Sequence, residues 1–320
     1  MKRNKLIAAN EISEIIAVDL NGYEQKILME GKRKELPIVI TLHGGPGTPI
    51  PFSVGCRGMF HEFTDKYIMV YWDQLGCGIN NYVIDDSFSI ETFVKMTEDL
   101  VTYIRKQFPE NKVMIFATSW GTILSAKLFE RNPNAVDGVV AAGQIIKNVF
   151  FADEVMESLE RANVPKKKLD RLKSVTIDNY SGKDLQLFSS CLNKYTDAYQ
   201  NKKGAKAPMG KMIKGLLTSP DYSLKDFKAI MVNGYMKNNS LWKEILHLDL
   251  SDVLSNIQVP YVILQGDTDF VASTKTVEEV VDASKNNNLK VHIVENTGHM
   301  PGIMMMEKLM DVLTDLAKII

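Results

Sequence analysis

The sequence predicts an α/β fold in which a mostly parallel sheet carries helices on both faces and is interrupted by a helical cap. Two observations carry this prediction. Short apolar runs typical of buried strands alternate with helical periods through residues 1–145 and again from about residue 258. Between them, residues 146–250 are helical in pattern, rich in lysine and without a buried-strand run. We therefore expect a core of residues 1–145 and 251–320, with a cap of residues 146–250 inserted into it.

The expected strands begin with a hairpin and continue as short apolar runs. Residues 15–20 and 23–30 are joined by Asn21-Gly22, a pair typical of type I′ turns. The later runs suit strands buried on both faces of a parallel sheet, at residues 37–42, 67–72, 112–117, 138–142, 261–264 and 290–294. Helical periods cover residues 89–107, 120–131, 273–284 and 303–320.

The composition of the 320-residue chain argues against several classes of protein. Its 38 Lys and Arg residues nearly balance 39 Asp and Glu, so the basic excess of a nucleic-acid binder is missing. No apolar run reaches the roughly 18 residues of a membrane span, and Glu11 and Glu14 interrupt the N-terminal apolar stretch. Cys56, Cys77 and Cys191 are too few for a disulfide framework or a zinc cluster. We expect a cytoplasmic protein without nucleic-acid or membrane partners.

Ser119 is the candidate nucleophile. It lies in Ala-Thr-Ser-Trp-Gly, residues 117–121, between an expected strand and an expected helix. A serine on such a strand–turn–helix elbow has its Oγ exposed above the carboxyl end of the sheet, beside a helix N-terminus that favours negative charge. The alternative interpretation is that Ser119 only caps the helix that begins at Trp120, because serine is a favoured N-cap.

The loop that follows the strand of residues 37–42 is a candidate oxyanion hole. His43-Gly-Gly-Pro-Gly47 lets the backbone turn sharply and present N–H groups to a ligand. We expect the amides of Gly45 and Trp120 to be the donors, with Gly44 as the alternative to Gly45. A phosphate-binding turn is the other interpretation, but the glycine patterns of nucleotide sites are absent. His43 precedes the turn and is expected to be structural.

An acid and then a histidine follow the serine along the chain, which is the order found in serine hydrolases whose nucleophile lies on a strand–turn–helix elbow. Asp269 comes after the strand of residues 261–264, and His299 comes after the strand of residues 290–294. Both positions are carboxyl ends of strands, where α/β sheets collect their sites. We expect His299 to accept the proton of Ser119 and Asp269 to orient His299, with Asp267 as the competing acid.

These motifs together resemble the α/β-hydrolase superfamily, and within it the proline iminopeptidase branch. The resemblance covers residues 14–145 and 258–320. It rests on residues 43–47 (His-Gly-Gly-Pro-Gly), 71–78 (Tyr-Trp-Asp-Gln-Leu-Gly-Cys-Gly), 119–122 (Ser-Trp-Gly-Thr), 266–269 (Gly-Asp-Thr-Asp) and 298–299 (Gly-His). It implies a capped hydrolase that releases an N-terminal proline or another residue from small peptides, without a metal or an organic cofactor.

The chain departs from the family pattern at three places. Ala117 replaces the usual first glycine of the elbow, and Leu75 stands where the family commonly has arginine. The cap lacks the Trp-x-x-Trp-Glu element whose glutamate helps such peptidases to bind the free amine of the substrate; Trp242 is the only tryptophan of the cap. The resemblance therefore supports the reaction class more strongly than the aminopeptidase activity.

The expected function is that of a serine hydrolase that needs no metal or cofactor and cleaves a small amide through an acyl-enzyme. A short peptide with a free N-terminus is the expected substrate. The first alternative is a carboxylesterase or lactonase with a small acyl substrate. An alternative of another class is a non-catalytic binding protein on a hydrolase scaffold. Nothing in the sequence indicates the oligomeric state.

Three features of the cap bear on the substrate. Residues 149–151 (Val-Phe-Phe) could line a pocket or pack as core, and Glu154, Glu157 and Glu160 could anchor an amine or form a solvated helix face. Residues 146–250 also contain 18 basic and 12 acidic side chains. This positive balance could hold the cap on the acidic core or favour anionic substrates.

Overall fold

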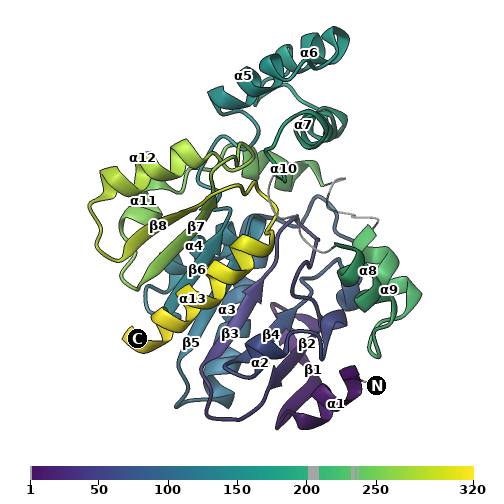
Figure 1. Cartoon of the computed structure of the whole chain (residues 1–320), viewed down its shortest axis with the longest axis vertical. Coiled ribbons are helices and arrows are strands. Elements are labelled where there is room, and N and C mark those ends of the chain that lie inside the picture. The colour runs from purple at the N-terminus through teal and green to yellow at the C-terminus, as the bar shows by residue number, and fades with distance from the viewer. Residues whose placement is uncertain (1, 201–208, 232–234, 236–237) are drawn as a thin grey trace.

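A computed structural model describes residues 2–200, 209–231, 235 and 238–320 of the chain (Figure 1). Its strands are β1 (Ile12–Leu20), β2 (Tyr23–Gly31), β3 (Ile38–Leu42), β4 (Ile68–Trp72), β5 (Val113–Thr118), β6 (Gly138–Ala142), β7 (Tyr261–Gly266) and β8 (Leu289–Val294). They form one eight-stranded sheet in the order β1-β2-β4-β3-β5-β6-β7-β8.

The sheet begins with an antiparallel hairpin and becomes parallel from β4 onward. Asn21 and Gly22, with φ of 55° and 80°, form the turn that sets Leu20 opposite Tyr23. β2 pairs antiparallel with β4, whereas each later pair of neighbours, from β4 and β3 to β7 and β8, is parallel. The predicted α/β class with a mostly parallel sheet is confirmed.

The helices cover the sheet and make up most of the insertion. They are α1 (Lys2–Ala9), α2 (His61–Thr64), α3 (Ile90–Gln107), α4 (Trp120–Arg131), α5 (Asp153–Arg161), α6 (Lys166–Lys173), α7 (Gly182–Tyr195), α8 (Met209–Leu217), α9 (Leu224–Met231), α10 (Asn239–Leu246), α11 (Ser251–Ser255), α12 (Thr274–Ser284) and α13 (Ile303–Ile319), with 3-10 turns η1 (Val54–Cys56) and η2 (Gly78–Asn80). Sequence patterns did not predict α1, because its apolar residues 6–9 are consecutive and lack helical spacing. In the part of the chain that the structure describes, no helix is long and apolar enough to cross a membrane.

Alternating side chains of the central strands supply two cores, one on each face of the sheet. On β3, Ile38, Ile40 and Leu42 belong to the core that contains the buried faces of α3 and α4. Val39, between them, belongs to the core that contains Leu309 and other residues of α13. In Figure 1, α13 lies in front of the sheet while α3 and α4 lie behind it. Helices therefore cover both faces, as a buried parallel sheet requires.

The inserted helices divide into two groups. In Figure 1, α5, α6 and α7 project beyond the edge of the sheet where β6 and β7 end, with α10 beneath them. α8 packs on η1 and α9 packs on η2, so the second group covers the loops that follow β3 and β4. The division of the chain into a core and a cap at residues 146 and 250 stays a prediction.

Asp73 anchors the second group to the sheet. Its Oδ1 accepts from the N–H of Val54 at 3.0 Å, and its Oδ2 accepts from the N–H of Ile79 at 3.0 Å and from the Tyr222 hydroxyl, which lies between α8 and α9. Asp73 is fully buried, and burial raises its pKa to about 6 against the lowering effect of these hydrogen bonds. The segment between β6 and β7 thus supplies, through Tyr222, one of the hydrogen-bond donors to a buried carboxyl.

We predict that Tyr222→Phe lowers the free energy of unfolding by about 1.5–3 kcal/mol at neutral pH, the usual worth of a hydrogen bond to a charged group. Because burial raises the pKa of Asp73 above its unfolded value, the contribution of Asp73 to the free energy of unfolding falls as pH rises through about 6. The substitution removes a bond that favours the ionised form, so its cost should shrink at about pH 4, where Asp73 is protonated. Urea unfolding at the two pH values measures this.

Tyr82→Phe is the matched control, because the Tyr82 side chain is 51% exposed. It should leave the free energy of unfolding nearly unchanged at both pH values. An equal loss at both pH values for Tyr222→Phe would contradict the assignment of its effect to ionised Asp73.

Candidate active site

Ser119 lies on a strained turn between β5 and α4. Its backbone has φ 48° and ψ −118°, a conformation that non-glycine residues rarely adopt, and its N–H donates to the carbonyl of Ala142 at 2.9 Å. Its side chain makes no capping hydrogen bond to α4, so the interpretation of Ser119 as a helix cap is wrong. Its Oγ contacts His299 instead.

Gly121 makes this turn possible. A Cβ added at Gly121 would lie 2.1 Å from the carbonyl oxygen of Leu42, so only glycine lets the first turn of α4 pack so closely against the end of β3. This close approach brings the loop after β3 beside Ser119.

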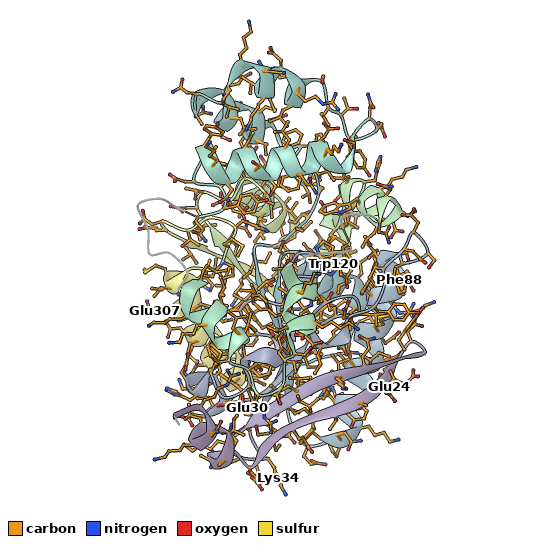
Figure 2. The ribbon with its side chains drawn as sticks, turned by 90° about the vertical axis from the view of Figure 1, so that its right-hand side faces the viewer. Glu24, Glu30, Lys34, Phe88, Trp120 and Glu307 are labelled. Atoms are coloured by element: carbon orange, nitrogen blue, oxygen red, sulfur yellow. The ribbon has the colours of Figure 1, made fainter. Side chains whose placement is uncertain are left out.

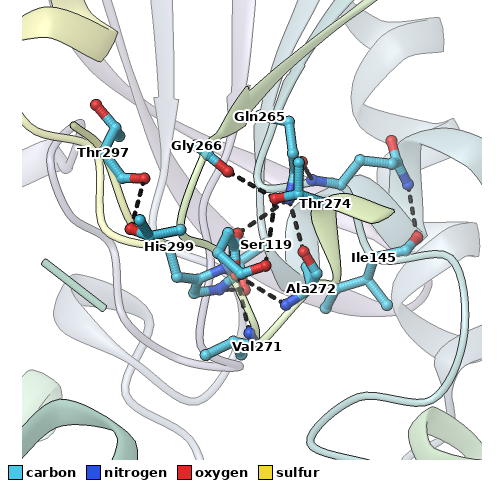
Figure 3. A network of polar contacts seen from close by, with 12 residues as sticks. Ser119, Ile145, Gln265, Gly266, Val271, Ala272, Thr274, Thr297 and His299 are labelled. Atoms are coloured by element: carbon cyan, nitrogen blue, oxygen red, sulfur yellow. Dashed lines mark hydrogen bonds and ion pairs between the residues drawn. The ribbon is translucent and has the colours of Figure 1, made fainter. Parts of the chain in front are cut away.

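The structure brings Ser119, His299 and Asp269 together in a line of hydrogen bonds (Figure 3). Ser119 Oγ lies 2.7 Å from Nε2 of His299, and Nδ1 of His299 lies 2.8 Å from Oδ2 of Asp269. His299 is 9% exposed and Asp269 is fully buried. The arrangement allows a proton to pass from the hydroxyl to the imidazole while the carboxylate fixes the ring and its tautomer.

The carboxylate of Asp269 is held by the loop that carries it. Oδ1 accepts from the N–H groups of Val271 and Ala272, both at 2.9 Å, and Oδ2 accepts from the side-chain amide of Gln265 at 3.1 Å. Figure 3 labels the three donor residues, Gln265, Val271 and Ala272, near Ser119 and His299. These three donors fix the orientation of the carboxylate toward His299.

Asp267, the competing acid, has a different position. Its carboxylate accepts from the N–H groups of Asn296 at 2.9 Å and Thr297 at 3.0 Å, in the loop that leads to His299. Asp267 therefore braces the histidine loop, while the contact with the imidazole belongs to Asp269.

The inserted segment also holds the histidine loop. The N–H of His299 donates to the carbonyl of Ala198 at 2.7 Å, and the N–H of Met300 donates to that of Tyr199 at 2.8 Å. The ring of Tyr199 meets the imidazole edge to face, with 6.1 Å between centroids. Sequence reasoning missed these contacts, because backbone carbonyls leave no signature in side-chain patterns.

The glycine loop lies against the serine. A Cβ on Gly44 would lie 3.1 Å from Cβ of Ser119, and Gly45 has φ 120°, where a Cβ would lie 2.6 Å from the N–H nitrogen of Gly47. Trp120 is the first residue of α4, and the first N–H groups of a helix have no partner within the helix. The structure thus brings the expected donors Gly44, Gly45 and Trp120 to the neighbourhood of Ser119.

Gln74 joins the two sides of this donor region. Its Oε1 accepts from the Trp120 indole N–H at 2.8 Å, and its Nε2 donates to the carbonyl of His43 at 3.2 Å. Trp120 lies inside the molecule (Figure 2) and is 1% exposed. In the sequence, only its place in the motif at residues 71–78 pointed to Gln74.

His43 is a structural residue, as expected. Its Nε2 accepts from the N–H of Gln74 at 3.0 Å, so Nδ1 carries the proton and donates to the carbonyl of Gly44 at 2.9 Å. Burial lowers the pKa of His43 to about 4, which keeps the ring neutral at neutral pH. A neutral ring in this tautomer fixes the start of the glycine loop.

A cavity of about 470 Å³ opens beside the serine. Ser119 and His299 lie in its wall with Gly44, Gly45 and Trp120, and residues of α7 and α10 form its other side. Among the residues that the structure describes, no three His, Cys, Asp or Glu side chains lie close enough to hold a metal ion.

The fold and this constellation define a hydrolase, and the chain belongs to the alpha/beta hydrolase fold family, which matches residues 37–303. It is similar to proline iminopeptidases. The probable aminopeptidase YbaC of Bacillus subtilis (strain 168) is 19% identical over 296 residues, which cover 89% of this chain and 90% of the relative. A proline iminopeptidase of Heyndrickxia coagulans is 26% identical over 287 residues, which cover 87% and 89%.

A solved structure shares the fold. The crystal structure of proline iminopeptidase from Mycobacterium smegmatis aligns with a TM-score of 0.62 at 16% identity, covering 95% of this chain and 98% of that one. The family resemblance drawn from the motifs is therefore confirmed, as is the α/β-hydrolase fold.

We predict that Gln74→Ala lowers the free energy of unfolding by about 2–5 kcal/mol, because it leaves the Trp120 indole and the His43 carbonyl unpaired in the interior. Urea denaturation measures this loss. In a double-mutant cycle with Trp120→Phe, the double variant should lose about 0.5–3 kcal/mol less than the sum of the losses in the two single variants. Simple additivity would show that the indole and the amide do not interact.

Proposed function

We propose that the chain is a serine hydrolase that forms an acyl-enzyme on Ser119. The observation that carries the proposal is the continuous hydrogen-bonded line from Ser119 Oγ through His299 to the buried Asp269, with distances of 2.7 Å and 2.8 Å. Nucleophile, base and orienting acid are the three groups that acyl transfer requires.

The reaction proceeds in two displacements. His299 Nε2 takes the proton of Ser119 as Oγ attacks the substrate carbonyl, and the new oxyanion is stabilised by the amides of Gly45 and Trp120, with Gly44 as the alternative donor. His299 then gives this proton to the leaving group. Water, activated by the same imidazole, hydrolyses the acyl-enzyme and restores the hydroxyl of Ser119.

Two substrate classes fit this machinery, each with its own support. The names of the relatives favour an aminopeptidase of proline iminopeptidase type acting on short peptides. The lining of the cavity favours a carboxylesterase or lactonase with a small acyl substrate, because no Asp or Glu occurs among its described lining residues. We propose residues 146–250 as the cap over this cavity. Location in the cytoplasm stays a prediction.

Fluorophosphonate labelling tests the nucleophile without a choice of substrate. We expect stoichiometric labelling of the wild-type protein and none of Ser119→Ala, measured by intact mass. Ser190→Ala is the matched control and should label fully, because Ser190 also lines the cavity while the serine hydroxyl at His299 Nε2 is that of Ser119. A folded wild-type protein that does not label would support the non-catalytic alternative.

The acid is tested by a pair of asparagine variants. Asp269→Asn should lower kcat by about ten-thousand-fold, because the imidazole loses the acceptor that fixes its tautomer. Asp267→Asn removes only a brace of the histidine loop and should cost far less, with a lower thermal stability as its main effect. Turnover of a p-nitrophenyl ester measures kcat for both variants. The reverse order of effects would assign the acid to Asp267.

A further inference from the structure

The wall of the cavity around Ser119 is apolar. Most of its buried lining side chains are aliphatic or aromatic: Ile123, Ile145, Val149, Phe150, Leu185, Trp242, Ile245 and Val271. Four uncharged polar residues of α7 also line the cavity. Gln186, Ser190 and Asn193 are exposed and form its mouth, whereas Ser189 is half-buried and accepts from the Tyr199 hydroxyl at 2.8 Å. A substrate therefore meets uncharged polar groups at the entrance and a mostly apolar wall inside.

Among the described residues that line the cavity, none offers a carboxylate to a charged amine. Apart from His299, the described residues that line the cavity carry no ionisable acidic or basic side chain except the phenol of Tyr199. The segments at residues 201–208, 232–234 and 236–237 contain no Asp or Glu in the sequence. A buried ammonium group without an anionic partner is strongly disfavoured, so the wall selects against an amino-acyl group with a free amine.

The three glutamates of α5 that could have anchored an amine have other partners. Glu154 accepts from the hydroxyl of Ser273. Glu157 pairs with Arg161 at 2.7 Å, and Glu160 pairs with Lys173 at 2.6 Å. None of the three lines the cavity.

Phe150 lies in the cavity wall and has a strained backbone. It lines the cavity and is 6% exposed, and its backbone has φ 65°, which is an outlier for a bulky side chain. Its ring stacks on Phe188 of α7, with 6.3 Å between centroids and 18° between planes. Strained residues that the surrounding structure holds in place are concentrated at functional sites. The neighbouring Phe151 also packs on Phe188, at 5.3 Å, but does not line the cavity.

We infer that the cavity binds an uncharged, apolar acyl chain, and that Phe150 determines how long a chain it accepts. This inference rests on the proposed acyl-enzyme at Ser119 and specifies its acyl group. The leaving group then lies toward the mouth, where Gln186, Ser190 and Asn193 offer hydrogen bonds.

The charge of the acyl group is tested with two esters of one shape. Alanine benzyl ester and isobutyric acid benzyl ester differ in an ammonium group against a methyl group. At about pH 6, below the usual pKa of an α-amino group, kcat/KM should be at least about tenfold higher for the isobutyrate. Equal values, or a preference for the alanine ester, would overturn the inference.

The role of Phe150 is tested with p-nitrophenyl esters of increasing acyl length. Phe150→Ala enlarges the cavity and should raise the ratio of kcat/KM for octanoate over butyrate by about tenfold or more. Phe151→Ala, the matched control, removes a neighbouring ring of the same cluster and should leave the ratio as in the wild type. An unchanged ratio in Phe150→Ala, or an equal shift in both variants, would overturn the assignment.

Fluorophosphonate labelling separates this inference from the proposed function. A wild-type protein that labels on Ser119 and prefers the ammonium ester retains the proposed function and loses the inference. If the protein does not label, the proposed function fails. Relative affinity is then measured by calorimetric titration with the two benzyl esters, and the isobutyrate should still bind at least about tenfold more tightly.

Discussion

The close packing of Gly121 against the Leu42 carbonyl is the contact on which the candidate site depends. Because position 121 has no side chain, α4 begins directly against the end of β3. Ser119 there has a positive φ, and its Oγ contacts His299 and makes no capping bond to α4. The same contact sets the Gly44–Gly45 loop beside the serine. Gln74 then joins the loop to the Trp120 indole, so that donors and hydroxyl form one rigid unit.

The parallel sheet supplies the remaining groups. β7 and β8 end on the same edge as β5, so the loops that follow them bring Asp269 and His299 to Ser119. The backbone carbonyls of Ala198 and Tyr199, in the inserted segment, hold the histidine loop. The segment between β6 and β7 thus takes part in holding the imidazole in place.

Strong local patterns made much of this predictable. The apolar runs predicted the parallel strands within one or two residues, and the order of serine, acid and histidine along the chain indicated which residues meet at the sheet edge. Asp267 and Asp269 are both acids after one strand, and only three-dimensional geometry separates their positions. The neutral lining of the cavity comes from α7, α10 and the loop at Phe150, distant segments whose meeting no local pattern encodes.

A crystal structure of the protein with an alkyl boronic acid tests the central claim most directly, because boron mimics the tetrahedral intermediate. We expect a covalent bond from Ser119 Oγ to boron, one boronate oxygen at hydrogen-bond distance from the amides of Trp120 and of Gly45 or Gly44, and the alkyl group against Phe150. A boronate bound away from Ser119, or one bonded to Ser119 with its oxygens turned from these amides, would contradict it.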